Sequence, residues 1–348
     1  MPAYTFIGPD RVEFSDPLTK SDIDKLAANL TIKVLQFSRP VNEISWGLLN
    51  TEFFPQRPDV QLRLYGFYTE VCDLSFVAGM DHVQHFAADC ILNATGVEQV
   101  SEMPNLKSLE IGIYNLESFE FLWHVPVGLT GLLLGATHSK KPNLQPLSRF
   151  KKLTRIYLEG QQKNIDVLAD LVELEDVTLR SISTPGLEYL SMLPRLWSLD
   201  IKLGGTSNLS AIAGMAGIKY LELWNIRGLE DIEVISHLPG LQNLFLQSLP
   251  FITAIPSLRE SRQLRRVFLQ NLKGLRDLSQ LQGAPVLEEF ILLQGEHQRV
   301  EDLLPVIHNP SLRRAAAYFG SIQKNKQFTQ LLGERGIEEY VFSAFQYT

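Results

Sequence analysis

Ile218-Lys-Tyr-Leu221-Glu-Leu223 and Leu241-Gln-Asn-Leu244-Phe-Leu246 carry the same apolar spacing, L-x-x-L-x-L, and begin 23 residues apart at positions 218 and 241. Between them lies a second apolar spacing, formed by Ile232, Ile235 and Leu238. Self-similarity at a fixed period of this length indicates a repeat protein. The sequence therefore predicts one repeating architecture before any single element is assigned.

The same unit continues through most of the 348 residues. Nine consecutive copies have their first apolar residue at positions 106, 129, 153, 174, 196, 218, 241, 264 and 287. Looser copies precede them at residues 32–37, 60–64 and 83–88, and follow them at 312–317 and 337–342. We interpret L-x-x-L-x-L as a short strand and the second spacing, such as Leu187, Leu190 and Leu193, as a helical or 3₁₀ turn. One unit cannot bury its leucines alone, so neighbours stack in parallel around a continuous core.

This pattern resembles the leucine-rich repeat family, most of all its short internalin-like, bacterial-type repeats of about 21–25 residues, from residue 32 to residue 342. The resemblance implies an α/β right-handed solenoid, or horseshoe, with a parallel concave β-sheet and short helices or 3₁₀ turns on the convex side. The family pattern L-x-x-L-x-L-x-x-N is not followed here. Asn225 and Asn271 fall one position early, and Ser181 and Ser248 take the equivalent position in other repeats.

We predict a single domain over residues 1–348, with an N-terminal cap at 1–30, repeats at 31–323 and a C-terminal cap at 324–348. The first cap is predicted to contain an amphipathic helix that buries Ile23, Leu26, Ala27 and Leu30, with Ser21 and Asp24 as a capping box. Residues 46–54 are expected to be a long connection. The second cap is predicted to hold a helix at 325–332 and a last strand at 340–345, an apolar edge that favours self-association unless the final residues fold over it.

Composition narrows the partners and the compartment. The net charge is −7, with 39 acidic and 32 basic residues and no basic stripe, which argues against a nucleic-acid partner. No apolar run is long enough for a membrane span, and the N-terminus lacks the features of a signal peptide. The two cysteines, Cys72 and Cys90, do not form a disulfide framework. We therefore expect a cytoplasmic protein with no membrane association and no cofactor.

One cluster raises the question of catalysis or zinc binding: His82 and His85, with Asp81, Asp89 and Cys90 nearby. Neutral imidazole and carboxylate groups are zinc ligands. The strand period places His85 and Asp89 on the open face while His82 precedes the strand, so these groups are not expected to converge, and we predict no metal site. Phosphate-binding, nucleophile-elbow and dinucleotide motifs are absent from the sequence. A non-enzymatic protein is therefore expected.

The period of two along each strand identifies the side chains on the concave face. The predicted partner-binding residues are Arg155, Tyr157, Glu159, Arg180, Asp200, Lys202, Tyr220, Glu222, Trp224, Phe245, Arg266 and Phe268. Phe245, Phe268 and Ile291 share one column and are expected to form an exposed apolar ridge. Such a ridge marks an interaction site or stabilises the sheet laterally. The charged members, together with Asp176, either pair along the sheet or select the partner.

The predicted function is therefore a non-enzymatic scaffold that recognises a protein partner on its concave face, with inhibition or regulation as the sharper hypothesis. A toxin-neutralising immunity protein and an enzyme regulatory subunit are the alternatives within that class. A self-assembling structural protein is the further alternative. The sequence does not identify the partner.

Overall fold

The computed structural model describes residues 3–14, 17–39 and 41–348. The chain forms two compact units, Met1–Leu174 and Glu175–Thr348. The prediction of a single domain with two caps stays a prediction.

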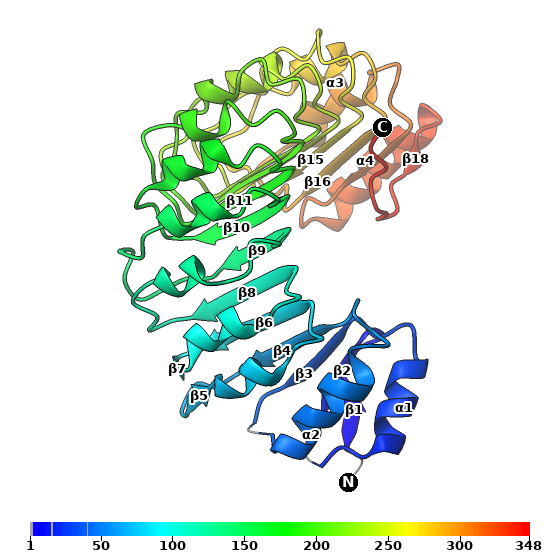
Figure 1. Cartoon of the computed structure of the whole chain (residues 1–348). Coiled ribbons are helices and arrows are strands. Elements are labelled where there is room, and N and C mark those ends of the chain that lie inside the picture. The colour runs from blue at the N-terminus through cyan, green and yellow to red at the C-terminus, as the bar shows by residue number, and fades with distance from the viewer. Residues whose placement is uncertain (1–2, 15–16, 40) are drawn as a thin grey trace. The chain divides into compact units, whose positions relative to one another are not determined.

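The first unit is built on strands in the order β1-β2-β3-β4-β6-β8-β9-β10, as Figure 1 shows. Only the β1–β2 pair is antiparallel among the pairs described in this sheet. A separate parallel pair joins β5 to β7. The bounds are β1 Tyr4–Phe6, β2 Arg11–Phe14, β3 Val34–Phe37, β4 Gln61–Tyr65, β5 Val71–Asp73, β6 His85–Ile91, β7 Asn93–Thr95, β8 Ser108–Ile113, β9 Gly131–Leu134 and β10 Arg155–Glu159.

Helices and short turns alternate with these strands. The α-helices are α1 Lys20–Ala28 and α2 Glu43–Leu48, and α2 continues into a π-helical turn, η1 Leu49–Phe53. The 3₁₀ turns are η2 Ser75–Gly79, η3 Val97–Glu102, η4 Glu120–Trp123, η5 Gln145–Arg149 and η6 Ile165–Asp170.

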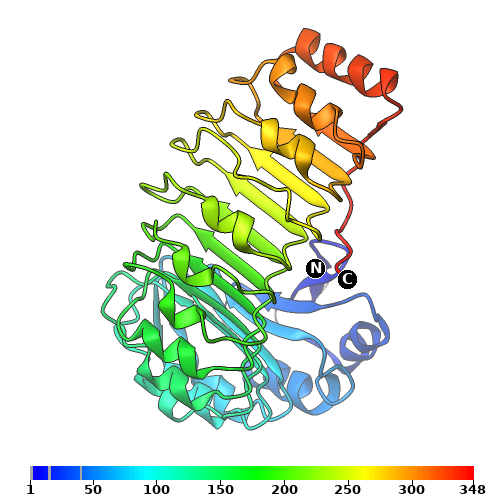
Figure 2. The same ribbon diagram turned by 90° about the horizontal axis from the view of Figure 1, so that it is seen from above.

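The second unit continues the same plan with strands in the order β11-β12-β13-β14-β15-β16-β17-β18, all in parallel register. Figure 2 shows these strands stacked one after another with the turns along one side. The strand bounds are β11 Asp176–Arg180, β12 Ser198–Lys202, β13 Tyr220–Trp224, β14 Asn243–Gln247, β15 Arg266–Gln270, β16 Glu289–Leu293, β17 Arg314–Ala317 and β18 Glu338–Glu339. The turns and helices are η7 Glu188–Leu190, η8 Ser210–Ile212, η9 Glu233–His237, η10 Ser279–Gly283, η11 Val300–Leu303, α3 Leu304–Ile307 and α4 Ile322–Glu334.

The repeat register is confirmed strand by strand. Leu221 pairs with Leu244 and Leu223 with Leu246, and all four side chains are fully buried. The second apolar spacing also behaves as predicted, because η7 buries Leu190 between the buried Leu187 and Leu193. Each repeat thus contributes apolar side chains to one core from its strand on one side and from its turn on the other.

The early Asn and Ser residues have a backbone function. Asn225, Ser248 and Asn271 each follow the last residue of a strand and adopt left-handed backbone angles, with φ of 49°, 51° and 52°. Asn tolerates this region better than most residues because its short polar side chain can bond locally. From this conformation their N–H groups donate to the carbonyl oxygens of Gln247, Gln270 and Leu293 in the next repeat, at 2.9–3.0 Å. These residues with left-handed backbone angles thus continue the hydrogen bonding between repeats beyond the strands. They lie one position before the Asn of the family pattern.

The N-terminal cap differs from the prediction. The β1–β2 hairpin precedes the first predicted strand and pairs with it through β2, so it was missed. The helix α1 starts earlier than predicted, because the capping box is formed by Thr19 and Asp22 and not by Ser21 and Asp24. Leu30 lies beyond the helix and is 73% exposed, so its predicted burial is wrong. The predicted connection at residues 46–54 is mostly helical, in α2 and η1.

The C-terminal cap also needs a correction. The predicted helix is present as the longer α4, but the predicted strand at 340–345 is absent, and pairing ends at β18 with Glu338 and Glu339. Residues 341–348, which we call the C-terminal tail, leave the sheet edge and turn back over the face of their own unit. The apolar edge strand that favoured self-association is therefore not formed.

Candidate functional site

In the second unit, the 3₁₀ turns cover one face of the sheet, and the strand residues that point away from them form the open face. Sheet register aligns these residues into columns: Lys202 lies beside Trp224, and Glu222, Phe245, Phe268 and Ile291 follow one another. The nine predicted site residues from Arg180 to Phe268 all lie on this face, as the period of two requires.

The charged residues of the face pair with one another. Lys202 Nζ lies 3.1 Å from a carboxylate oxygen of Asp200 and 3.1 Å from one of Glu222. Tyr220 donates its hydroxyl to Glu222 at 2.8 Å. Arg266 donates to Glu289 at 2.5 Å, and both side chains are buried. The pairing of opposite charges, one of the two sequence hypotheses, is thus present at Asp200, Lys202 and Glu222.

Burial shifts the ionisation of this cluster. It raises the pKa of Asp200 to about 6, with the nearby Glu222 carboxylate adding to the effect and Lys202 opposing it. Burial alone lowers the pKa of Lys202, but the carboxylates of Asp200 and Glu222 outweigh it and raise that pKa. Burial followed by Glu222 raises the pKa of Tyr220 as well. Among the described residues, Asp200 Oδ1 is buried with no hydrogen-bond partner, in keeping with a carboxylate that is costly to ionise.

Asp200→Asn is expected to flatten the pH dependence of stability between about pH 4 and pH 7. The folded protein keeps a proton on Asp200 that the unfolded chain releases near pH 4, so stability falls as pH rises through the folded pKa of about 6. At about 1.4 kcal/mol per pKa unit, a rise of about two units makes this fall about 3 kcal/mol. Urea denaturation at a series of pH values measures it.

Asp277→Asn is the matched control, because hydrogen bonds from Ser279 lower the pKa of Asp277 and place its contribution below pH 4. An Asp200→Asn protein whose stability retains the wild-type slope from pH 4 to pH 7 contradicts the prediction.

The aromatic residues gather on two parts of the face. The rings of Phe245 and Phe268 are 4.6 Å apart, and the guanidinium of Arg180 lies 5.6 Å from the ring centre of Trp224. Ile291, the third member of the predicted ridge, is fully buried in a cluster with Ala316 and Tyr340. The expected exposure of the ridge is therefore wrong at Ile291, because the chain that follows β18 covers it.

The C-terminal tail occupies the side of the face where the strands begin. It passes the starts of β15, β14 and β13, and Figure 1 shows it in dark red near the end labelled C. Arg265 donates to the Gln346 carbonyl at 2.5 Å, and Lys219 donates to the Thr348 carbonyl at 2.7 Å. Sequence reasoning missed this contact. Phe345 and Tyr347, two positions apart, are the signal in the sequence, but the apolar residues Val341, Phe342 and Phe345 predict an edge strand instead.

The other three predicted site residues, Arg155, Tyr157 and Glu159, lie on β10 of the first unit. Tyr157 and Glu159 line a mostly apolar hollow of about 570 Å³, and Tyr157 donates its hydroxyl to Glu159 at 3.0 Å. The hollow exists because Gly112 and Gly135 stand where other repeats carry side chains. The further lining residues include Tyr68, Ile91, Leu92, Tyr114 and Leu133.

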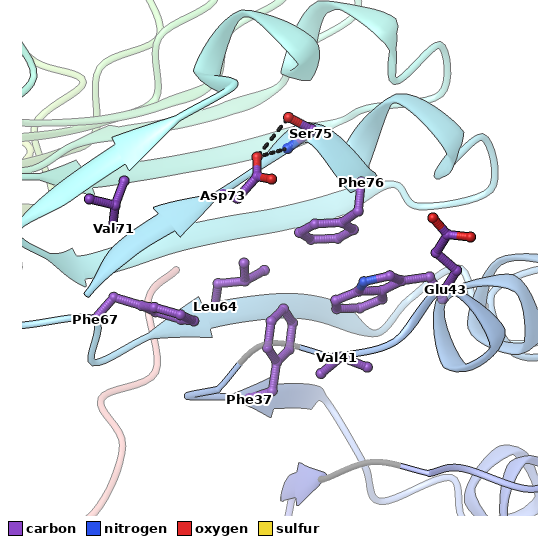
Figure 3. Close-up of a pocket in the computed structure, with 10 residues that line it drawn as sticks. Phe37, Val41, Glu43, Leu64, Phe67, Val71, Asp73, Ser75 and Phe76 are labelled. Carbon is purple, nitrogen blue, oxygen red and sulfur yellow. Dashed lines mark hydrogen bonds between the residues drawn. The ribbon is translucent and has the colours of Figure 1, made fainter. Parts of the chain in front are cut away.

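A second hollow of about 420 Å³ in the first unit was not predicted. Figure 3 shows Phe37, Phe67 and Phe76 around it, with the Asp73 carboxylate accepting bonds from the N–H and hydroxyl of Ser75. Trp46, from α2, stacks on Phe76 at 4.0 Å. The sequence predicts a connection, not a helix, over residues 46–54 and therefore gives no reason to bring these rings together.

The histidine cluster does not assemble as a metal site. His85 Nδ1 hydrogen-bonds Ser108 at 2.7 Å, and Asp89 forms an ion pair with Arg63 at 2.8 Å. Within the described ranges, no three His, Cys, Asp or Glu side chains are placed to hold a metal ion. Cys72 and Cys90 are free thiols, one buried and one exposed.

No helix in the described part of the chain is both long enough and apolar enough to cross a membrane.

These features define a protein with the leucine-rich-repeat fold. Over 86% of its length the chain is similar to an internalin from Listeria monocytogenes, of which 89% is covered, with a TM-score of 0.58 and 19% sequence identity. Over 94% of its length it is similar to a leucine-rich-repeat protein of Leptospira interrogans, of which 93% is covered, with a TM-score of 0.51 and 14% identity. No protein family and no curated protein matches the sequence. At these identities the likeness concerns the fold.

Proposed function

We propose that the protein is a non-enzymatic scaffold that binds a protein partner on the open face of its second unit. The observation that carries the proposal is the register of the face, which sets Phe245 beside Phe268 and Trp224 beside Lys202 on adjacent strands. Trp and Tyr dominate binding energy at many protein interfaces, and a surrounding charged rim selects the partner.

The charge pairs support a rigid, pre-organised face. Lys202 is held between two carboxylates, and Arg180 is held over Trp224. Side chains that are already fixed lose less conformational entropy when a partner binds. Inhibition or regulation of the partner, as by an immunity protein or a regulatory subunit, and a cytoplasmic location are the finer parts of this proposal.

Affinity capture from a lysate of cells that naturally make the protein tests the proposal. Trp224→Ala/Phe245→Ala is expected to lose a partner that the wild type retains, with binding weakened at least tenfold, because both rings belong to the open face. Phe268 is left intact because it packs against the buried cluster of Ile291 and Tyr340.

The matched control is Met192→Ala. Met192 follows the 3₁₀ turn η7 on the covered side of the sheet and is 73% exposed. Circular dichroism must show all proteins folded. A partner that binds the double variant as well as it binds the wild type overturns the proposed face.

A further inference from the structure

We propose that this face recognises an extended peptide segment with two aromatic side chains two positions apart. The C-terminal tail occupies the same binding site, which we call the seat, and acts as an internal competitor. The inference rests on the proposed function and deepens it, because it names the chemistry of the partner and a means of regulation. Its evidence is the set of contacts that the tail makes with residues at and just before the starts of β12–β15.

The backbone of the tail is held by an amide. Gln242 accepts from the Thr348 N–H at 3.0 Å and donates to the Thr348 carbonyl at 2.9 Å. Lys219 donates to the same carbonyl at 2.7 Å, and Arg265 donates to the Gln346 carbonyl. The Thr348 hydroxyl also donates to the Gln242 side-chain oxygen, at 3.3 Å. The other bonds engage main-chain groups of the tail, which an extended peptide of a different sequence also offers.

The aromatic side chains of the tail supply the selectivity. The Phe345 ring lies 4.8 Å from the guanidinium of Arg265 and 4.9 Å from that of Arg266, which are cation–π distances. Tyr347 packs against Trp197 at 5.1 Å and accepts from Asn243 at 3.1 Å. Tyr347 also meets Tyr220 at 6.5 Å. A segment without these two rings would make the backbone bonds but lose the contacts with these five side chains.

The seat is pre-organised by groups of the sheet itself. Glu289 fixes Arg266, and the Gln242 side-chain oxygen accepts from Arg265 at 3.1 Å. Gln242 is only 1% exposed with the tail in place, although its amide makes few other bonds: one to Arg265 and one to Gln263 at 3.4 Å. A buried amide requires hydrogen-bond partners, and the tail backbone satisfies this requirement.

The tail itself is weakly anchored. Val341 is 76% exposed, Phe342 and Tyr347 are also exposed, and residues 341–348 form no strand with the sheet. Segments with little buried surface open at low free-energy cost. A tethered segment nevertheless competes strongly, because a short linker gives an effective concentration in the millimolar range. A partner with the same chemistry can therefore enter only when it outcompetes the tail.

The test uses a fluorescently labelled peptide of the tail sequence, Val341-Phe-Ser-Ala-Phe-Gln-Tyr-Thr348, and fluorescence anisotropy. A chain that ends at Tyr340, which keeps Ile291 covered, is expected to bind the peptide at least about tenfold more tightly than the full chain. In the shortened chain, Arg265→Ala is expected to weaken binding. Arg262→Ala is the matched control, because Arg262 is exposed, pairs with Glu260 and does not contact the tail in the described structure.

A peptide in which alanine replaces both Phe345 and Tyr347 is expected to lose binding. If the shortened chain does not fold by circular dichroism, the full chain with Phe345→Ala/Tyr347→Ala replaces it and is expected to bind the wild-type peptide more tightly than the unmodified chain. A folded shortened chain that does not bind the peptide, or that binds it no better than the full chain, overturns the inference.

This result is separable from the test of the proposed function. Trp224 is not among the residues that the tail contacts, so loss of a captured partner in Trp224→Ala/Phe245→Ala stands whether or not the peptide binds. Conversely, tight peptide binding together with a partner that ignores the double variant supports the seat at the strand starts and overturns the proposed contact of that partner with Trp224 and Phe245.

Discussion

Arg57→Ala is expected to lower the free energy of unfolding by about 3 kcal/mol, although Arg57 lines neither hollow and belongs to no predicted site. Its side chain is buried and donates to the carbonyls of Asn29 and Ile32, each at 2.7 Å, and to the Asp59 carboxylate at 2.9 Å. Alanine would leave the buried Ile32 carbonyl without this donor, while the partly buried Asn29 carbonyl would keep only the Ile32 N–H, at 3.3 Å. Each buried acceptor that loses its partner costs roughly 1–3 kcal/mol.

Urea denaturation followed by circular dichroism measures the change. Lys20→Ala is the control, since Lys20 forms an exposed ion pair with Glu52 at 3.6 Å, and such pairs contribute about 1 kcal/mol at most. A loss no larger than that of Lys20→Ala would show that water replaces Arg57 at both carbonyls.

The Arg57 effect also has a pH signature. The hydrogen bond from Arg57 is the main cause that lowers the pKa of Asp59 to about 2. A carboxylate with a lowered pKa stabilises the fold above its unfolded pKa near 4, and this contribution is lost as pH falls through 2. The difference between wild type and Arg57→Ala is therefore expected to shrink as pH is lowered from 4 to 2.

The repeats could be predicted from sequence because their signal is redundant. Buried apolar residues at positions 4 and 6, such as Leu244 and Leu246, recur from unit to unit, and each repeat buries those of its neighbour. The terminal elements carry no such redundancy. The β1–β2 hairpin and α2 occur once each, and α1 begins at Lys20 because the capping box of Thr19 and Asp22 sets its start.

The period of two was enough to assign residues to the open face, but it could not show that the C-terminal tail lies over part of that face. Alternation places Tyr220 and Arg266 on the face, yet it contains no information on a segment about 80 to 130 residues further along the chain. Phe345 and Tyr347 are two positions apart whether they extend a strand or fold back, with Phe345 over Arg265 and Arg266 and Tyr347 against Trp197. Only the three-dimensional path of the chain after β18 separates the two.

Glycine contacts between repeats give the last prediction. Gly128 and Gly240 occupy the same position of the repeat, immediately before the first apolar residues Leu129 and Leu241. A Cβ atom built on Gly240 would lie 2.0 Å from the Ala216 carbonyl oxygen in the preceding repeat, whereas one built on Gly128 would have no atom within 4 Å. The turn before β14 thus packs backbone to backbone, and the turn before β9 does not.

Gly240→Ala is accordingly expected to destabilise the protein by about 3 kcal/mol, because the rigid neighbour is a main-chain carbonyl that cannot move without displacing its repeat. Gly128→Ala is expected to be neutral or stabilising by up to about 1 kcal/mol, since alanine restricts the unfolded chain. Urea denaturation of both variants measures effects of opposite sign at equivalent positions. Equal effects would mean that the turns relax freely, and the close stacking of successive repeats would then not be what selects glycine before Leu241.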